Sequence, residues 1–272
     1  MKTFVDICCG IGSFHYSFQK KGWKCVMACD INKNARDNYE MNYGIKPLGD
    51  LYEIDIDSIP KFDILCAGFP CQPFSNAGFH MGFEDTRGIL FFEIMKWVKH
   101  HKPPYVILEN VSAILSHDSG NTFKVIQKML KDEGYNVSYK LLKCSDYGIP
   151  QMRKRVFIVG CLESDPNTIL DVDKFKKHVT LSEFMGMNFE KDTAYTIRCG
   201  GKHSPIHGKH NWDGYFVDEK EYRLTIQDAL KLQGFDSSFV LCGSNKDKWD
   251  RLGNTIPTIF TEMIATNLSL QL

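Results

Sequence analysis

The chain carries no excess charge of either sign, because 33 lysine and arginine residues balance 33 aspartate and glutamate residues. The overall charge therefore indicates no particular partner, and any surface that binds an anion must be local. No apolar run approaches the roughly 18 residues that a membrane span requires, so we expect no membrane partner. The first apolar stretch contains Asp6, which is not typical of a signal peptide, and we expect a cytoplasmic protein.

Paired cysteines are also missing. The chain has ten cysteines, yet no two form a Cys-x-x-Cys pair and none has zinc-finger spacing. We therefore expect no metal site and no disulfide framework, and we interpret most of the thiols as small buried side chains in a reducing compartment.

The length of 272 residues predicts one large domain, or one domain with a small partner. Apolar residues make up 43% and charged residues 24% of the chain, which is typical of a globular protein. Strand-like runs cover residues 3–8, 24–29, 62–67, 105–108 and 156–159, and helix-like segments cover 13–21, 88–100 and 122–131. This alternation predicts an α/β fold with a parallel sheet covered on both faces.

The pattern changes near Asp165, where the chain becomes irregular and rich in glycine, histidine and asparagine. Residues 193–211 contain Arg198, Lys202 and Lys209 but no acidic residue. We expect a second, smaller, loop-rich domain here. A last helix near residues 257–268 has an apolar stripe that suits packing against the first domain.

The first motif that suggests chemistry is a glycine turn at the end of the first strand. Gly10 and Gly12 let the backbone approach a ligand closely, and Asp30 ends the next strand about 20 residues later, where it can accept from ribose hydroxyls. This favours a nucleoside cofactor, either a dinucleotide or S-adenosylmethionine. His15 replaces the third glycine of a full GxGxxG pattern, and a plain structural turn explains the motif equally well.

The second motif places Cys71 between Pro70 and Pro73, directly after a buried strand. Active sites of parallel sheets lie at the carboxyl ends of strands, and a proline fixes the backbone just before the sulfur. A sheltered thiol does not require such a frame, so we favour a nucleophile over a buried cysteine.

Two further motifs flank strands. Glu109 ends the strand at 105–108 and could face the same cleft as Cys71, although a helix cap explains it equally well. Arg153 and Arg155 alternate at the head of the strand at 156–159, so both side chains should point to one side and could bind a phosphate or a base carbonyl. A solvated charged edge is the alternative.

Taken in order, these motifs resemble those of the DNA (cytosine-5)-methyltransferases of bacterial restriction-modification systems. The matching segments are 6–14 (DICCGIGSF), Asp30, Gly49-Asp50, 68–75 (GFPCQPFS), Glu109-Asn110-Val111, 151–155 (QMRKR), 223–235 and 253–257 (GNTIP). The resemblance covers nearly the whole chain except about residues 165–222. Cys8 stands where the family usually has phenylalanine, and Ser13 where it often has glycine.

The resemblance implies a Rossmann-like α/β fold with a mostly parallel sheet that binds S-adenosylmethionine. It implies a catalytic domain over residues 1–185 and 250–272 and a target-recognition domain over 186–249. The implied cofactor-binding residues are Asp6, Cys8, Gly10, Ile11, Gly12, Ser13, Phe14, Asp30, Ile31, Asp50, Leu51, Gly68, Pro70, Asn254 and Ile256.

The resemblance also implies the chemistry. Cys71 adds to carbon 6 of cytosine, Glu109 acts at ring nitrogen 3, and Arg153 and Arg155 supply a cationic neighbourhood for the thiolate. The target base must be flipped out of the duplex. The residues expected to bind DNA are Gln72 and Ser75 beside Cys71, and Arg198, Lys202 and Lys209, which lie in the basic stretch that contains no acidic residue.

The resemblance implies a monomer that acts on duplex DNA, with a companion restriction endonuclease as its functional counterpart. A tRNA cytosine-5 methyltransferase shares the same catalytic residues and is the nearest alternative. A nicotinamide-dependent oxidoreductase would leave Cys71, Glu109 and the two arginines without roles. A non-enzymatic DNA-binding protein is disfavoured because every reacting position is present.

Overall fold

A computed structural model of the protein describes residues 1–70, 90–171, 178–200 and 202–271. The larger sheet consists of β1 (Thr3–Ile7), β2 (Lys24–Cys29), β3 (Ile64–Gly68), β4 (Tyr105–Val111), β5 (Asn136–Lys143) and β6 (Lys154–Cys161). The helices are α1 (Ser13–Gln19), α2 (Lys33–Tyr43), α4 (Leu90–His101), α5 (Asn121–Asp132), α6 (Pro166–Leu170), α7 (Leu181–Met185), α8 (Ile226–Leu232), α9 (Asn245–Asn254) and α10 (Thr258–Ser269). A hairpin pairs β7 (Gly214–Val217) with β8 (Lys220–Arg223).

The six strands lie in the order β2-β1-β3-β4-β6-β5. Pairs β1–β2, β1–β3 and β3–β4 are parallel, whereas β6 runs antiparallel to both β4 and β5. The α/β class is confirmed, but the sheet is mixed and not parallel throughout. A short connection over residues 144–153 joins β5 to β6, and strands joined in this way run antiparallel because a parallel crossover needs a dozen residues or more.

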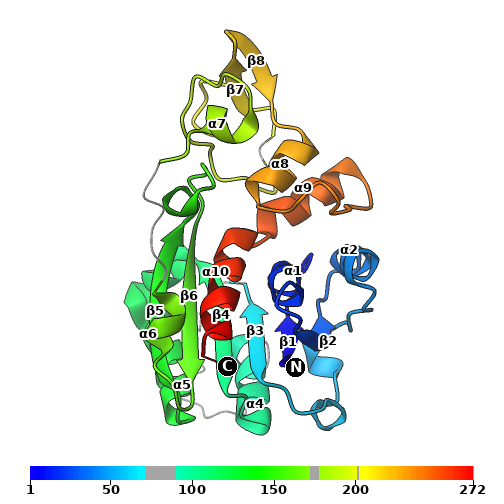
Figure 1. Ribbon diagram of the computed structural model, residues 1–272, viewed down its shortest axis with the longest axis vertical. Coiled ribbons are helices and arrows are strands. Elements are labelled where there is room, and N and C mark those ends of the chain that lie inside the picture. The colour runs from blue at the N-terminus through cyan, green and yellow to red at the C-terminus, as the bar shows by residue number, and fades with distance from the viewer. Residues whose placement is uncertain (71–89, 172–177, 201, 272) are drawn as a thin grey trace.

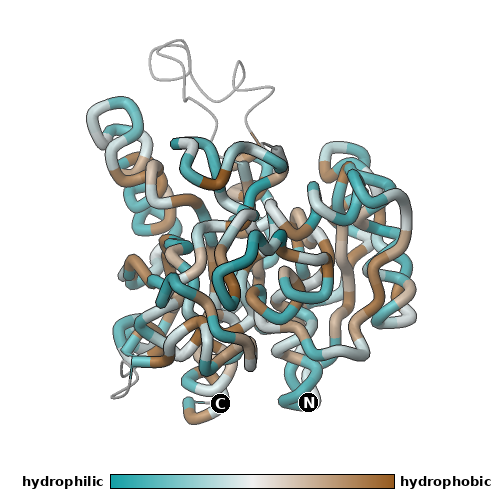
Figure 2. Tube along the Cα trace, turned by 90° about the horizontal axis from the view of Figure 1, so that it is seen from above, coloured by the Kyte–Doolittle hydropathy of each residue, from teal (hydrophilic) through white to brown (hydrophobic). Residues whose placement is uncertain are grey.

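Alternate residues of each strand face opposite sides of the sheet, and two hydrophobic cores form there. One core joins Phe4, Ile64 and Ile107 of the strands to α1 and α10, and the other joins Val5, Leu65 and Val106 to α4 and α5. Figure 2 shows the consequence along the chain, where the peripheral turns are largely hydrophilic and hydrophobic stretches run between them. No helix within the described ranges is long and apolar enough to cross a membrane.

The β7–β8 hairpin and α7 lie at the opposite end of the molecule from both chain termini, beyond α8 and α9 (Figure 1). The helix expected near residues 257–268 is confirmed as α10. It packs against α1, where the Ser17 and Thr261 hydroxyls lie 2.6 Å apart, as well as through apolar contacts. The end of the chain therefore lies beside its first helix, which brings motifs more than 240 residues apart to one place.

Candidate active site

The carboxyl ends of the parallel strands gather the sequence motifs at one edge of the sheet. Gly68, the last residue of β3, pairs with Glu109 of β4. A Cβ atom on Gly68 would lie 3.3 Å from Oε2 of Glu109, so the absence of a side chain there makes room for the carboxyl group. Pro70 is exposed two residues further on, while Cys71, Gln72 and Ser75 lie outside the described residues.

Glu109 is a buried carboxyl group beside a positive charge. The residue is 6% exposed, and Nε of Arg155 lies 2.7 Å from its Oε1. Burial raises the pKa of Glu109, and the charges of Arg155 and Arg153 lower it by less. A carboxyl group in this setting keeps its proton to higher pH than an exposed glutamate, which suits proton transfer near neutral pH.

The residue after Glu109 holds the strand end that leads to Cys71. The Asn110 side chain is 2% exposed, and its Nδ2 donates to the carbonyl of Phe69 at 2.8 Å. This buried amide fixes the backbone directly before Pro70. The motif Glu109-Asn110-Val111 marked this position in the sequence, but the role of the amide depends on a carbonyl 41 residues away and was missed.

The two arginines have different surroundings. Arg153 is 1% exposed, and its guanidinium donates to the carbonyls of Ile197 at 2.9 Å, Gly253 at 2.8 Å and Thr255 at 2.6 Å. Burial lowers its pKa to about 9. Arg153 thus joins the head of β6 to the irregular segment and to the end of α9, and the alternative of a solvated edge does not fit it. Arg155 instead pairs with Glu109.

The glycine turn after β1 lies beside two acidic residues. Asp30 accepts from the backbone N–H of Gly10 at 2.8 Å and from that of Asn32 at 2.8 Å, and burial raises its pKa. Asp6 is 1% exposed, and within the described ranges its Oδ2 has no hydrogen-bond partner. Burial, followed by the charge of Asp30, raises the pKa of Asp6. An unpaired buried acceptor below a glycine turn is a feature that a bound polar ligand could satisfy.

The C-terminal motif reaches the same turn. Ser13 donates through its hydroxyl to the carbonyl of Ile256 at 2.7 Å, and the Ile256 side chain lies against Gly68. Asn254 is exposed at the end of α9, where its Oδ1 accepts from the Cys199 thiol at 3.1 Å. The serine that departs from the family pattern therefore ties the first turn to the last motif.

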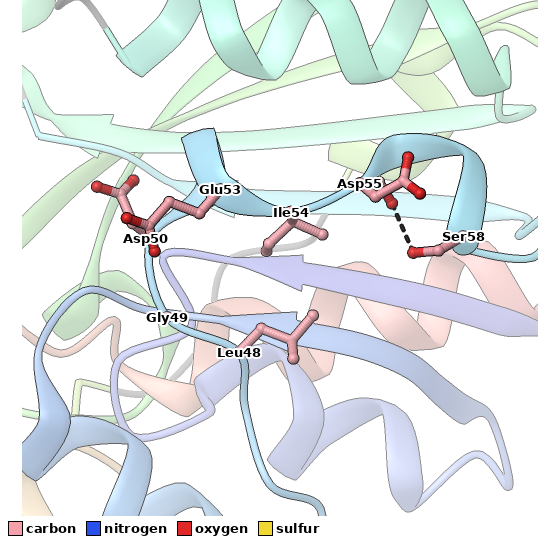
Figure 3. A pocket seen from close by; sticks show the side chains of 7 residues that line it. All are labelled: Leu48, Gly49, Asp50, Glu53, Ile54, Asp55 and Ser58. Atoms are coloured by element: carbon pink, nitrogen blue, oxygen red, sulfur yellow. Dashed lines mark hydrogen bonds between the residues drawn. The ribbon is translucent and has the colours of Figure 1, made fainter.

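A cavity of about 320 Å³ lies along the segment that follows β2. It is lined by Leu48, Gly49, Asp50, Glu53, Ile54, Asp55 and Ser58. Figure 3 shows three carboxyl groups along this segment, and the Ser58 hydroxyl donates to the Asp55 carbonyl at 2.6 Å. Of the charged residues that line this cavity, Asp50 is the one that we expect to bind the cofactor. Its Oδ1 accepts from the Tyr52 N–H and so caps the 3-10 turn Leu51–Glu53.

The remaining residues expected at the cofactor site differ in exposure. Cys8 is partly exposed and has a left-handed backbone with φ of 54°, and Ile31 is 77% exposed directly after Asp30. Those that are buried in the core are Ile11, Phe14 and Leu51.

Of the basic residues expected to meet DNA, Arg198 and Lys209 are exposed. Lys202 lies over the Trp249 ring, with its ammonium 4.3 Å from the ring centre, so this lysine already has a partner within the protein. An ion pair stabilises the segment around them: Asp213 is fully buried, and its Oδ1 lies 3.1 Å from Nη1 of Arg223. Neither the Lys202–Trp249 contact nor the Asp213–Arg223 ion pair had a distinct signal in the sequence.

Comparison with solved structures defines the fold. The structure of S. pombe Dnmt2 methyltransferase matches with a TM-score of 0.76 at 19% identity, over 100% of this chain and 99% of that one. A putative DNA modification methyltransferase encoded within an E. coli prophage matches with a TM-score of 0.75 at 17% identity, over 99% of each chain. The chain thus has the α/β fold of these methyltransferases.

Comparison of sequences defines the family. The model of C-5 cytosine-specific DNA methylases matches residues 2–194. The type II methyltransferase M.NgoBI of Neisseria gonorrhoeae is 48% identical over 88% of this chain and 84% of its own length, and M.HhaI of Haemophilus parahaemolyticus is 31% identical over 99% and 94%. The chain belongs to the C-5 cytosine-specific DNA methylase family and is a DNA (cytosine-5)-methyltransferase.

Proposed function

We propose that this protein transfers a methyl group from S-adenosylmethionine to carbon 5 of one cytosine within a short specific sequence of duplex DNA. The observation that carries the proposal is the buried Glu109–Arg155 pair, which lies beside the strand end that leads to Cys71. The named relatives are type II methyltransferases, which supports a role as the modification enzyme of a restriction-modification system, acting as a monomer with a companion endonuclease as its functional counterpart.

The residues around the glycine turn fit S-adenosylmethionine, which supplies an electrophilic methyl group when bound. The buried Oδ2 of Asp6 has no hydrogen-bond partner among the residues that the structure describes, and the Asp30 carboxyl accepts from the Gly10 N–H. Ile31 and Asp50 offer an exposed apolar surface and an acceptor beyond them. The full set proposed to hold the cofactor is Asp6, Cys8, Gly10, Ile11, Gly12, Ser13, Phe14, Asp30, Ile31, Asp50, Leu51, Gly68, Pro70, Asn254 and Ile256.

Carbon 5 of cytosine becomes nucleophilic only after the ring is activated. The Cys71 thiolate bonds to carbon 6, the electron pair of the ring double bond moves to carbon 5, and Glu109 gives a proton to nitrogen 3. Arg155 keeps the Glu109 carboxyl in place. After carbon 5 gains its methyl group, a solvent base takes the carbon 5 proton, the electron pair of that C–H bond re-forms the ring double bond and expels the Cys71 thiolate, and Glu109 takes its proton back from nitrogen 3.

DNA recognition is assigned to residues 186–249. The target carbon is stacked inside the duplex, so the cytosine must be flipped out to reach Glu109. Gln72 and Ser75 follow Cys71 and are proposed to contact the DNA beside it. Arg198 and Lys209 are exposed and suit phosphate or base contacts, whereas Lys202 must leave Trp249 to make one.

Labelled methyl transfer tests the proposal directly. We expect label from S-adenosylmethionine to enter duplex DNA and not tRNA, and sequencing of the product to place it on one cytosine of a fixed motif. Cys71→Ser should abolish transfer while retaining cofactor binding. Transfer to tRNA alone would establish the alternative substrate, and near-normal turnover of Cys71→Ser would refute the covalent step.

A mechanism-based trap tests the adduct independently. Duplex DNA with 5-fluorocytosine at the target blocks the final elimination, because fluorine replaces the proton that must leave. We expect a covalent enzyme–DNA complex that survives denaturation when cofactor is present. The same complex formed by Cys71→Ser would assign the bond to another residue.

A further inference from the structure

Three aromatic side chains lie directly under the glycine turn, and the chemistry above does not use them. We call His15 of α1 with Tyr39 and Tyr43 of α2 the aromatic support. The rings of His15 and Tyr43 stack with centres 4.1 Å apart and planes 9° apart. Nδ1 of His15 lies 2.7 Å from the Tyr39 hydroxyl, which fixes the third ring against the other two.

The aromatic support contacts the turn through its backbone. The Tyr43 hydroxyl donates to the carbonyl of Gly12 at 2.8 Å and approaches that of Ile11 at 3.2 Å. Gly12 has φ of 84°, and a Cβ atom there would lie 2.3 Å from Cε2 of Tyr43 and 2.9 Å from Cε2 of Tyr39. The backbone of the turn therefore packs directly against the two tyrosine rings, and only glycine fits at position 12.

The stacked imidazole carries no charge at neutral pH. His15 is 5% exposed, and burial lowers its pKa to about 4. The ring can therefore stay packed on Tyr43 without a counter-ion. It occupies the position at which a GxGxxG pattern would have its third glycine, so in this chain an aromatic stack replaces a close helix–strand approach.

We propose that Tyr43 is a positioning residue for methyl transfer, held by the stacked ring of His15, and that it presets the Ile11–Gly12 backbone for the cofactor. The inference rests on the proposed use of S-adenosylmethionine. Neither His15 nor Tyr43 takes part in the proposed bond changes, so we expect an effect on cofactor affinity and not on the chemical step. A turn that already has its bound conformation lowers the entropy cost of cofactor binding, because the backbone need not be ordered when the cofactor binds.

Tyr43→Phe keeps the ring and removes the hydroxyl that holds the two carbonyls. We expect the KM for S-adenosylmethionine to rise about three- to tenfold, the range for loss of one hydrogen-bonding group. The kcat at saturating cofactor and the KM for DNA should stay at the wild-type values, because the reacting groups are untouched.

Tyr135→Phe is the matched control. Tyr135 is also buried, and its hydroxyl donates to the Pro103 carbonyl at 2.8 Å. Pro103 precedes the amino end of β4, so this bond lies at the opposite ends of the strands from the glycine turn. It should lose a comparable hydrogen bond without changing the KM for the cofactor. An unchanged KM in Tyr43→Phe, or an equal rise in both variants, overturns the inference.

Substitutions of His15 separate stacking from mere bulk. His15→Phe keeps a flat ring on Tyr43 and should retain a near wild-type KM, whereas His15→Leu, of similar size, should raise it. Calorimetric titration of S-adenosylmethionine gives the same comparison without turnover. A wild-type protein that binds the cofactor but does not methylate DNA would refute the proposed function alone, and one that does not bind it would overturn both.

Discussion

Lysine substitutions at Arg153 and Arg155 should separate stability from chemistry. Arg153→Lys keeps the charge but can reach only one of the three carbonyls that the guanidinium now contacts, those of Ile197, Gly253 and Thr255. A hydrogen bond from a charged group contributes about 1.5–3 kcal/mol net, so two lost bonds amount to about 3–6 kcal/mol. That is a large share of the roughly 5–15 kcal/mol by which a domain is stable.

Urea unfolding followed by tryptophan fluorescence measures this loss, and methyl-transfer kinetics at low temperature measure the activity that remains. Arg155→Lys is the comparison, since Nε of Arg155 lies 2.7 Å from Oε1 of Glu109 and its Nη1 donates to the neighbouring Lys154 carbonyl. We expect it to unfold within about 2 kcal/mol of wild type and to lose about 10- to 100-fold in kcat. Equal urea midpoints for Arg153→Lys and wild type would refute the structural role of Arg153.

Three further predictions concern buried polar groups. Burial raises the pKa of Glu109, so kcat should fall as the pH rises through that pKa, and Glu109→Gln should lose at least about 100-fold in labelled methyl transfer at pH values where Glu109 is protonated, with the gap narrowing above its pKa; a pH-independent wild-type kcat would contradict this. The pKa of His15 is lowered to about 4, so the unfolded chain takes up this proton near pH 6.5 before the folded chain does. The free energy of unfolding should therefore fall by up to about 1.4 kcal/mol per pH unit between pH 6.5 and 4, and less steeply in His15→Phe urea titrations. Asn38 bonds both the N–H and the sulfur of Cys242, so Asn38→Ala should lower the free energy of unfolding by about 1–3 kcal/mol in the same assay without changing kcat.

The strands that carry the site could be predicted because they are short, buried and apolar. Residues 24–29 match β2, and the run at 105–108 lies within β4. The direction of β6 could not be predicted, because its apolar residues give the same pattern in either direction. β5 was missed since it lies at the sheet edge and alternates Asn136, Ser138 and Lys140 with partly exposed apolar residues, which dilutes any hydrophobic signal.

Motif spacing predicted which residues meet at the strand ends but not what each one contacts. Alternation along an extended chain treats Arg153 and Arg155 alike. Their difference arises from carbonyls 44 to 102 residues further along the chain, which spacing cannot reveal. The role of the Tyr43 hydroxyl was missed for the same reason, because the carbonyl to which it donates lies in the turn after β1.

The division of the chain at residue 185 also remains a prediction, and the contacts of the last segment bear on it. Buried side chains from residues 189–239 belong to the same hydrophobic core as α1 and α10. Gln151 donates to the Leu232 carbonyl, and the Gln233 carbonyl accepts from the Thr258 N–H, so the end of α8 is bonded to the connection before β6 and to the start of α10. Beyond α8, the β7–β8 hairpin lies at the far end of the molecule. We therefore expect changes in target recognition to be tolerated best in the β7–β8 hairpin, because the Ile197, Gly253 and Thr255 carbonyls that Arg153 contacts lie outside it.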